Sequence, residues 1–177
     1  MNKEMLASRI RDTAILQGEF TLRSGRISSW YIDKYLFTTQ PDILLALGEL
    51  FAEKISKTTT LLAGAELGGI PLVTTASMAT QLPCIFIRNQ KKEYGTAQQL
   101  EGNLNASDIV VIVEDVATTG GQVLEAAATI QESGATVEAI IAVIDRCEGA
   151  RENIETAGFV FDSLFTTADL GITEAGV

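Results

Sequence analysis

Two adjacent acidic residues, Glu114 and Asp115, follow an apolar run at 109–113 and precede a segment rich in threonine and glycine at 118–121. The backbone N–H groups of such a turn can bind a phosphate, above all where a helix begins, because the helix dipole favours an anion there. Glycines let the backbone come close to a ligand, and threonine hydroxyls can donate further hydrogen bonds. We therefore expect this segment to hold a phosphate group.

The acidic pair beside the turn would repel a bare phosphate. Carboxylates do accept hydrogen bonds from the vicinal hydroxyl groups of a sugar, so the pair and the turn together indicate a ribose phosphate. The segment lacks the lysine of a G-x-x-x-x-G-K-[ST] loop, and residues 64–69 miss the G-x-G-x-x-G spacing of dinucleotide-binding proteins. The competing interpretation, in which Thr118 or Thr119 only caps a helix, requires no acidic pair.

The composition excludes several classes of protein. The chain has no histidine, which rules out His-based triads and His-ligated zinc. Its net charge of −10 argues against nucleic acid as a partner. An anionic substrate would therefore need local cations, a metal ion or backbone amides. Cys84 and Cys147 have no metal-ligand spacing and are expected to be reduced, buried thiols.

The elements that must position these residues follow from apolar periodicity. It predicts an α/β fold in which a central, mostly parallel sheet is flanked by helices, with a small N-terminal hairpin between 20–23 and 30–33. Strands are predicted at 60–65, 84–87, 109–113, 139–144 and 159–165, the last at an edge, and helices at 3–17, 41–57, 70–81 and 121–133.

The length of 177 residues fits one domain over residues 1–177. No apolar run reaches the roughly 18 residues that cross a bilayer, and the first residues lack the apolar core of a signal peptide. We therefore expect a cytoplasmic protein without a membrane partner. Residues 88–107 form a long connection that carries Arg88, Lys91 and Lys92, as lids and binding loops often do.

Residues 109–122 resemble the signature with which type I phosphoribosyltransferases bind phosphoribosyl pyrophosphate (PRPP). Four other segments are similar to the orotate phosphoribosyltransferases within that family. They are the N-terminal signature at 20–31, the pyrophosphate loop at 66–71, the flexible catalytic loop at 86–95 and the C-terminal segment at 144–165.

This resemblance implies an enzyme, a pentosyltransferase that transfers the phosphoribosyl group of PRPP to orotate. The products would be orotidine 5′-monophosphate and pyrophosphate, on the route to UMP. It also implies a homodimer, with Mg²⁺ carried on PRPP and no metal ligand supplied directly by the protein. Residues 1–40 would form part of a hood over the base, and the loop around Lys92 would reach the partner subunit's site.

The resemblance assigns the site residues as well. Lys92, Arg88 and Asp115 would be catalytic, and Glu66, Leu67, Gly68 and Gly69 would form the pyrophosphate loop. Orotate would be bound by Tyr31, Ile32, Thr118 and Arg146. PRPP would be bound by Arg23, Arg88, Lys92, Glu114, Asp115, Val116, Ala117, Thr118, Thr119, Gly120, Gly121 and Gln122.

The chain departs from the family pattern at three positions. Members often have Lys at the position of Asn89 and His at that of Tyr94, and some have Lys at that of Gly68. These departures leave room for a PRPP- or nucleotide-sensing regulatory protein without turnover. A phosphoribosyltransferase for another base is a further alternative, against which the signature at 20–26 and the pair Asp145-Arg146 argue.

Each assigned residue also has a plainer interpretation. Arg146 could form only a surface ion pair with Glu148, and Trp30 is expected to be a core aromatic. Lys92 alone would be a solvated loop lysine, and Arg23 would only decorate the hairpin.

Overall fold

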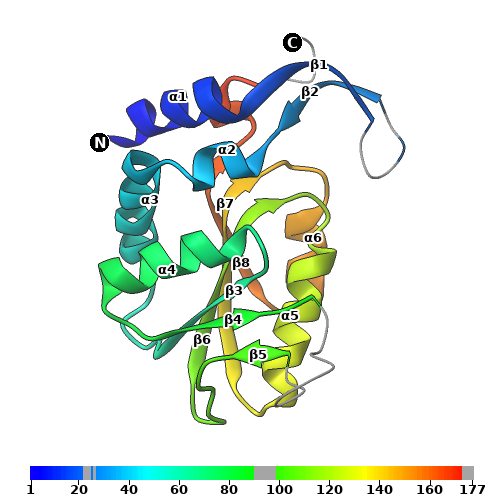
Figure 1. The fold of residues 1–177 in the computed structure, drawn as a ribbon. Coiled ribbons are helices and arrows are strands. Elements are labelled where there is room, and N and C mark those ends of the chain that lie inside the picture. Colours follow the sequence, from blue (N-terminus) through cyan, green and yellow to red (C-terminus); the bar gives the residue numbers. More distant parts are fainter. Residues whose placement is uncertain (22–24, 26, 90–98, 173–177) are drawn as a thin grey trace.

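In the computed structural model, residues 1–21, 25, 27–89 and 99–172 are described (Figure 1). The helices are α1 (Lys3–Ala14), α2 (Lys34–Thr38), α3 (Pro41–Lys54), α4 (Gly69–Thr80), α5 (Gly121–Glu132), α6 (Ala150–Thr156) and the 3₁₀ helix η1 (Ala168–Leu170). The strands are β1 (Ile15–Thr21), β2 (Ile27–Ile32), β3 (Leu61–Ala65), β4 (Cys84–Ile87), β5 (Leu100–Glu101), β6 (Ile109–Ala117), β7 (Thr136–Asp145) and β8 (Val160–Thr166).

A six-stranded sheet in the order β5-β4-β3-β6-β7-β8 forms the centre of the fold. The neighbours from β4 to β8 are parallel, and only the short β5 is antiparallel to β4. This confirms the predicted α/β fold and the place of the last strand at an edge. The central strands are apolar on both faces because helices cover both faces.

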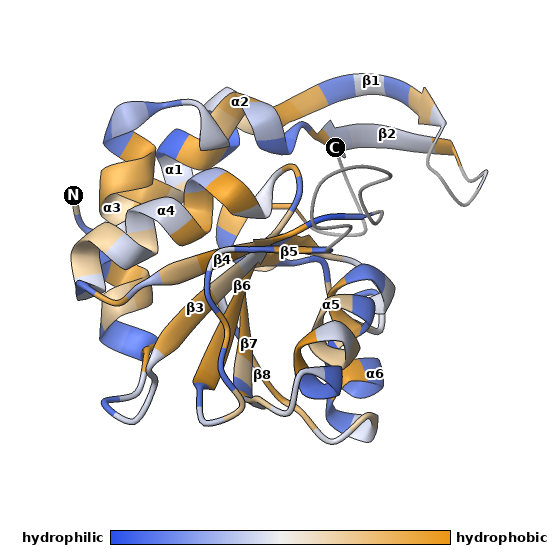
Figure 2. Ribbon diagram, turned by 60° about the horizontal axis from the view of Figure 1, so that its bottom comes forward, coloured by the Kyte–Doolittle hydropathy of each residue, from blue (hydrophilic) through white to orange (hydrophobic). Residues whose placement is uncertain are grey.

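The helices form two layers, one on each face of the sheet, and Figure 2 shows α3 and α4 on one side and α5 and α6 on the other. Val111 and Val113 of β6 belong to the core on the α3–α4 side, whereas Val110 and Ile112 belong to the core on the α5–α6 side. The alternation of side chains along a strand produces this division. The same alternation places the side chains of Glu114 and Asp115, the next two residues of β6, on opposite faces of the sheet.

The N-terminal segment consists of α1, the antiparallel hairpin β1–β2 and α2, which we call the hood (Figure 1). Leu6 and Ile10 of α1 share a core with Leu170 and Ile172 at the other end of the described chain, and Lys3 Nζ lies 5.4 Å from the centre of the Phe165 ring. The first and last described segments therefore hold each other in place.

The predicted helix at 3–17 is too long, because α1 ends at Ala14. Ile15 and Leu16, which lie within the predicted range, pair instead with Ile32 and Tyr31 across the hairpin. Ile15 is β-branched and therefore suits a strand at this boundary. The hairpin begins earlier than its turn residues indicated.

Several other boundaries differ from the expected ones. Strand β6 continues to Ala117, so the acidic pair lies within the strand, and α3 stops at Lys54. The elements α2, β5, α6 and η1 are too short to leave a clear periodicity and were not predicted. Cys147 is exposed and Cys84 is half-buried, so the expectation of two buried thiols was wrong. Among the described residues, no helix is long and apolar enough to cross a membrane.

Candidate active site

The carboxyl ends of β3, β4, β6 and β7 meet at one edge of the sheet, because these strands are parallel neighbours. Ligands of open α/β sheets bind at this edge. The structure brings four predicted parts of the site there. They are the pyrophosphate loop (66–69), Arg88, the segment 114–122 and Arg146.

The loop between β6 and α5 has the features of a phosphate-binding turn. Gly120 has a φ of +79°, and a Cβ atom there would lie 2.9 Å from Ile154 Cγ1, so only glycine fits. The side chain of Asn153 donates a hydrogen bond to the Thr119 carbonyl (2.9 Å) and the Arg146 N–H donates to that of Ala117 (3.0 Å). Neighbouring elements therefore hold the loop in shape.

Among the described residues, no side chain caps the amino end of α5, whose N-cap is Gly120. The first N–H groups of a helix have no acceptor within the helix, and here they start at the sheet edge. The interpretation in which Thr118 or Thr119 serves as a helix cap is therefore wrong. The turn is free to use these groups for an anion.

The acidic pair is buried, with Glu114 8% and Asp115 3% exposed. Burial, together with the neighbouring Asp115 charge, raises the pKa of the Glu114 carboxyl to about 8, although the ammonium of Lys34 opposes the shift. Two carboxylates so close in a dry setting cannot both ionise without compensation. The site therefore holds a proton near neutral pH that a cationic or hydrogen-bonding ligand would displace.

Lys34, at the first position of α2, compensates the second carboxylate. Its Nζ lies 2.8 Å from Asp115 Oδ2, while Oδ1 of the same carboxylate accepts a hydrogen bond from the Val116 N–H (2.6 Å). Sequence reasoning missed Lys34. In the sequence, Lys34 is only a lysine that follows the N-terminal signature at 20–31, and its partner Asp115 lies far away along the chain.

The pyrophosphate loop lies directly against this pair. A Cβ atom on Gly68 would lie 1.7 Å from Asp115 Oδ2, so no side chain fits at position 68 with the carboxylate in this place. Leu67 is 63% exposed, and the peptide bond between Glu66 and Leu67 is cis. The loop thus approaches the acidic pair through its glycine backbone.

Asn89 connects three parts of the site. Its N–H donates to Glu66 Oε1 (2.7 Å), and its side-chain oxygen accepts a hydrogen bond from Gln122 Nε2 (2.9 Å). The residue that replaces a common lysine of the family therefore joins the pyrophosphate loop to the start of α5. Sequence reasoning had treated this position only as a missing cation.

Arg88 directly follows β4, and its guanidinium group lies near Glu101 of the neighbouring antiparallel strand β5. Its Nη1 lies 3.7 Å from Glu101 Oε1. Its Nε atom is buried and has no hydrogen-bond partner in the part of the chain that the structure describes. The guanidinium group is therefore incompletely satisfied at the edge where an anion would bind.

Arg146 lies between β7 and the hood. Its Nε and Nη2 atoms lie 2.9 and 2.8 Å from Glu148 Oε1, and its guanidinium stacks over the Trp30 ring at 4.6 Å. The plainer interpretation, an ion pair with Glu148, is therefore present here, although the side chain is only 9% exposed. Trp30 is half-buried: it packs against the core on one side and on Arg146 on the other, so it is only in part the core aromatic that was expected.

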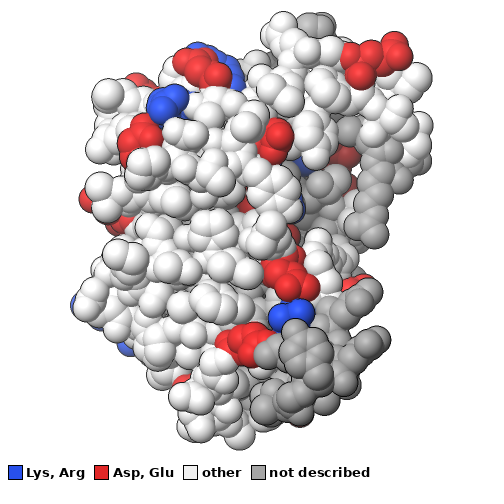
Figure 3. Space-filling view, in the orientation of Figure 1, with Lys and Arg blue, Asp and Glu red and all other residues white. Residues whose placement is uncertain are grey.

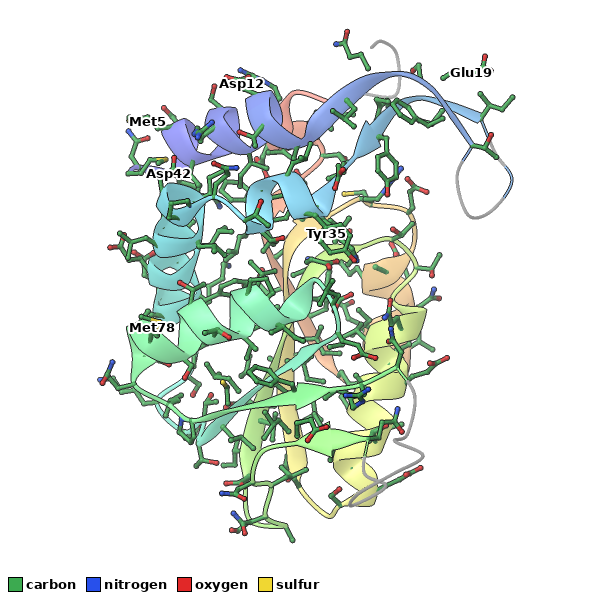
Figure 4. The ribbon with its side chains drawn as sticks, viewed as in Figure 1. Met5, Asp12, Glu19, Tyr35, Asp42 and Met78 are labelled. Carbon is green, nitrogen blue, oxygen red and sulfur yellow. The ribbon has the colours of Figure 1, made fainter. Side chains whose placement is uncertain are left out.

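The hood residues assigned to orotate differ in exposure. Tyr31 is 40% exposed and its ring packs against Phe20, with centroids 5.6 Å apart, whereas Ile32 is buried in the core. Tyr35, labelled in Figure 4, comes from α2, and Lys34 Nζ lies 5.6 Å from the centre of its ring. Tyr31 and Tyr35 are therefore two exposed aromatic side chains of the hood.

Two predicted residues, Arg23 and Lys92, lie outside the described residues. On the face shown in Figure 3, acidic side chains are more widespread than basic ones. A cavity of about 320 Å³ lies elsewhere, between α1 and η1, and none of the predicted site residues lines it. The predicted site residues that the structure describes therefore gather at the sheet edge and not around this cavity.

Comparison with known proteins agrees with this arrangement. A family model of the phosphoribosyl transferase domain matches residues 36–174. The orotate phosphoribosyltransferase of Natronomonas pharaonis is 42% identical over 171 residues, which cover 96% of this chain and 98% of that protein. The orotate phosphoribosyltransferase of Mycobacterium tuberculosis, solved with Fe(III) dicitrate, matches with a TM-score of 0.87 at 30% identity, over 96% of this chain and 99% of that one. Its structure in complex with PRPP matches with a TM-score of 0.81 at 29% identity, over 96% and 99%. The chain therefore belongs to the phosphoribosyltransferase family, among the orotate phosphoribosyltransferases.

Proposed function

We propose that this protein transfers the 5-phosphoribosyl group of PRPP to orotate, giving orotidine 5′-monophosphate and pyrophosphate in the synthesis of UMP. The observation that carries the proposal is the buried acidic pair of β6, which leads directly into an uncapped, glycine-rich helix start. Relatives over almost the whole chain bear the name of this enzyme.

The ribose phosphate of PRPP would occupy the β6–α5 turn. Glu114 and Asp115 would accept hydrogen bonds from the ribose hydroxyls, and the N–H groups of 118–122 would hold the 5-phosphate. The pyrophosphate would lie toward the loop 66–69, where the backbone can come close because position 68 has no side chain. Arg88, and Lys92 from the following loop, would bring positive charge to this leaving group.

Orotate would bind between the hood and the carboxyl end of β7, against Tyr31 and beside Thr118. Arg146 would face its carboxylate or carbonyl groups, since a guanidinium matches such planar groups with two hydrogen bonds. Glu148 Oε1 already contacts the guanidinium group of Arg146, so orotate would have to share or replace that contact.

Mg²⁺ would enter together with PRPP. Mg²⁺ prefers phosphate oxygens and water to an all-protein cage, so the phosphates of PRPP would carry it. When bound, the ion would neutralise part of the pyrophosphate charge. The acidic residues near it would remain hydrogen-bond acceptors for the sugar.

In the reaction, the lone pair of a ring nitrogen of orotate forms a bond to the anomeric carbon of PRPP. The bond from that carbon to the pyrophosphate oxygen breaks, and the leaving group takes its electron pair. Deprotonated orotate is a sufficient nucleophile, so no covalent enzyme intermediate and no histidine are needed. The residues act by orienting two anions and by stabilising charge on the leaving group.

The protein would work as a homodimer in which the loop around Lys92 completes the partner subunit's site. A cytoplasmic location remains a prediction from the sequence. The homodimer and its shared loop rest on the resemblance of residues 86–95 to the family's catalytic loop.

The test is an absorbance assay of orotate consumption with purified protein, PRPP and Mg²⁺, with uracil, adenine and hypoxanthine as controls. We expect turnover with orotate alone. Turnover with another base would reassign the substrate. Tight PRPP binding without turnover of any base would favour the regulatory alternative, for which the uncharged Asn89 and Gly68 would be the reason.

A further inference from the structure

Lys34 links the hood to the acidic pair of the active site. Its ammonium lies 2.8 Å from Asp115 Oδ2, and the side chains of the two residues are 31% and 4% exposed. The other oxygen of Asp115 accepts the Val116 N–H. The carboxylate is therefore held at both of its oxygens, once by its own strand and once by the hood.

The ammonium lies at the place that a ligand would use. Oδ2 of Asp115 touches Lys34 and also lies against the backbone of Gly68 in the pyrophosphate loop. A sugar hydroxyl that donates to this oxygen must therefore approach beside Lys34. An anionic group on that sugar would meet the positive charge on the same side.

The pair is a poor candidate for a merely stabilising contact. Taking both partners out of water costs about as much as their attraction returns, so buried ion pairs contribute little net stability. The pKa of Lys34 is nevertheless raised: burial lowers it, and Asp115, Tyr35 and Glu114 together more than offset that effect. Lys34 therefore keeps its positive charge in a partly buried site, where the charge can attract an anionic ligand.

We propose that Lys34 is a substrate-positioning residue, which holds Asp115 for the ribose hydroxyls and brings the hood's positive charge to the phosphate side of PRPP. This rests on the proposed function. Because position 68 cannot carry a side chain while Asp115 has this orientation, the cation beside the pyrophosphate loop comes from α2 and not from the loop itself.

The test compares Lys34→Met with the wild type by steady-state kinetics and by calorimetric binding of Mg²⁺–PRPP without orotate. We expect KM and Kd for PRPP to rise at least tenfold, as for the loss of a charge-assisted hydrogen bond, while KM for orotate changes less than about twofold. Lys34→Arg, which keeps the charge, should restore most of the PRPP affinity.

A matched control is Lys54→Met, which removes the ion pair of Lys54 with Asp162 between α3 and β8, away from the site. It should leave both KM values unchanged. If circular dichroism shows that Lys34→Met does not fold, the test uses Lys34→Gln and Lys34→Arg instead. The affinity for PRPP should fall in Lys34→Gln and be kept in Lys34→Arg.

Unchanged PRPP affinity in Lys34→Met, or equal losses for PRPP and orotate, would overturn the proposal and leave the contact as a structural one. The binding measurement needs no turnover. A wild type that binds PRPP but converts no orotate would therefore refute the proposed function without deciding on Lys34, whose variants would still be compared by their Kd for PRPP.

Discussion

Replacing Glu114 with glutamine should remove the main pH dependence of stability near neutral pH. Burial and the neighbouring Asp115 raise the pKa of Glu114 from the ordinary value of 4.5 to about 8. Between these values the unfolded chain has lost this proton and the folded chain still holds it. The folded state therefore loses stability as the pH rises, by at most about 1.4 kcal/mol per pH unit.

The window from pH 5.5 to 7.5 isolates this effect, because the chain has no histidine and few other groups titrate there. Two pH units set an upper limit of about 3 kcal/mol on the loss of wild-type stability. We expect about 2 kcal/mol, since relaxation and water entry reduce the interaction of buried charges below its ideal size. The Glu114→Gln variant should lose almost nothing over the same window.

The assay is urea unfolding at pH 5.5, 6.5 and 7.5, followed by far-UV circular dichroism and by the fluorescence of the single tryptophan, Trp30. Glu138→Gln is the control. Hydrogen bonds from Thr59 and Thr58 lower the pKa of Glu138, so its contribution is lost only as the pH falls below about 4.5. A difference between wild type and Glu114→Gln that stays constant from pH 5.5 to 7.5 would refute the reasoning.

Three further predictions concern substrate use. Lys92→Ala should lower kcat by about 10²–10³, the effect of removing one preorganised donor, and an unchanged kcat in a spectrophotometric assay would place the role elsewhere. Arg146→Lys should raise KM for orotate far more than KM for PRPP, because lysine cannot form the two-pronged contact; equal rises would contradict this. Gly68→Ala should destabilise the protein by about 1–3 kcal/mol and weaken PRPP binding, because its methyl group would displace Asp115; an unchanged melting temperature and Kd would show that the loop yields freely.

The parts of the fold that could be predicted are those with a repeated apolar pattern. Strand β4 has the bounds expected for it, β3 and α5 differ from their expected ranges by one residue at one end, and α4 differs by one residue at each end. The end of α1 could not be read in this way, because Ile15 and Leu16 continue the helical pattern while pairing in the hairpin. Tertiary pairing overrides local periodicity at such boundaries.

The residues of the candidate site also fall into those that the sequence could predict and those that it could not. The turn 118–121 and its acidic neighbours were found because their chemistry is contiguous in the sequence. Lys34 and the hydrogen bonds of Asn89 were missed because their partners, Asp115, Glu66 and Gln122, lie far away in the chain. Only the three-dimensional arrangement reveals that an uncharged residue at 89 serves as a connector.

The packing of α1 against η1 has a consequence for the order in which the protein is made. Leu6 and Ile10 leave the ribosome long before Leu170 and Ile172, which belong to the same core. The sheet edge with its phosphate turn can form before that moment, whereas the hood cannot settle on it. A nascent chain would therefore acquire the half of the site for the sugar phosphate first, and the half that would select the base only when η1 arrives.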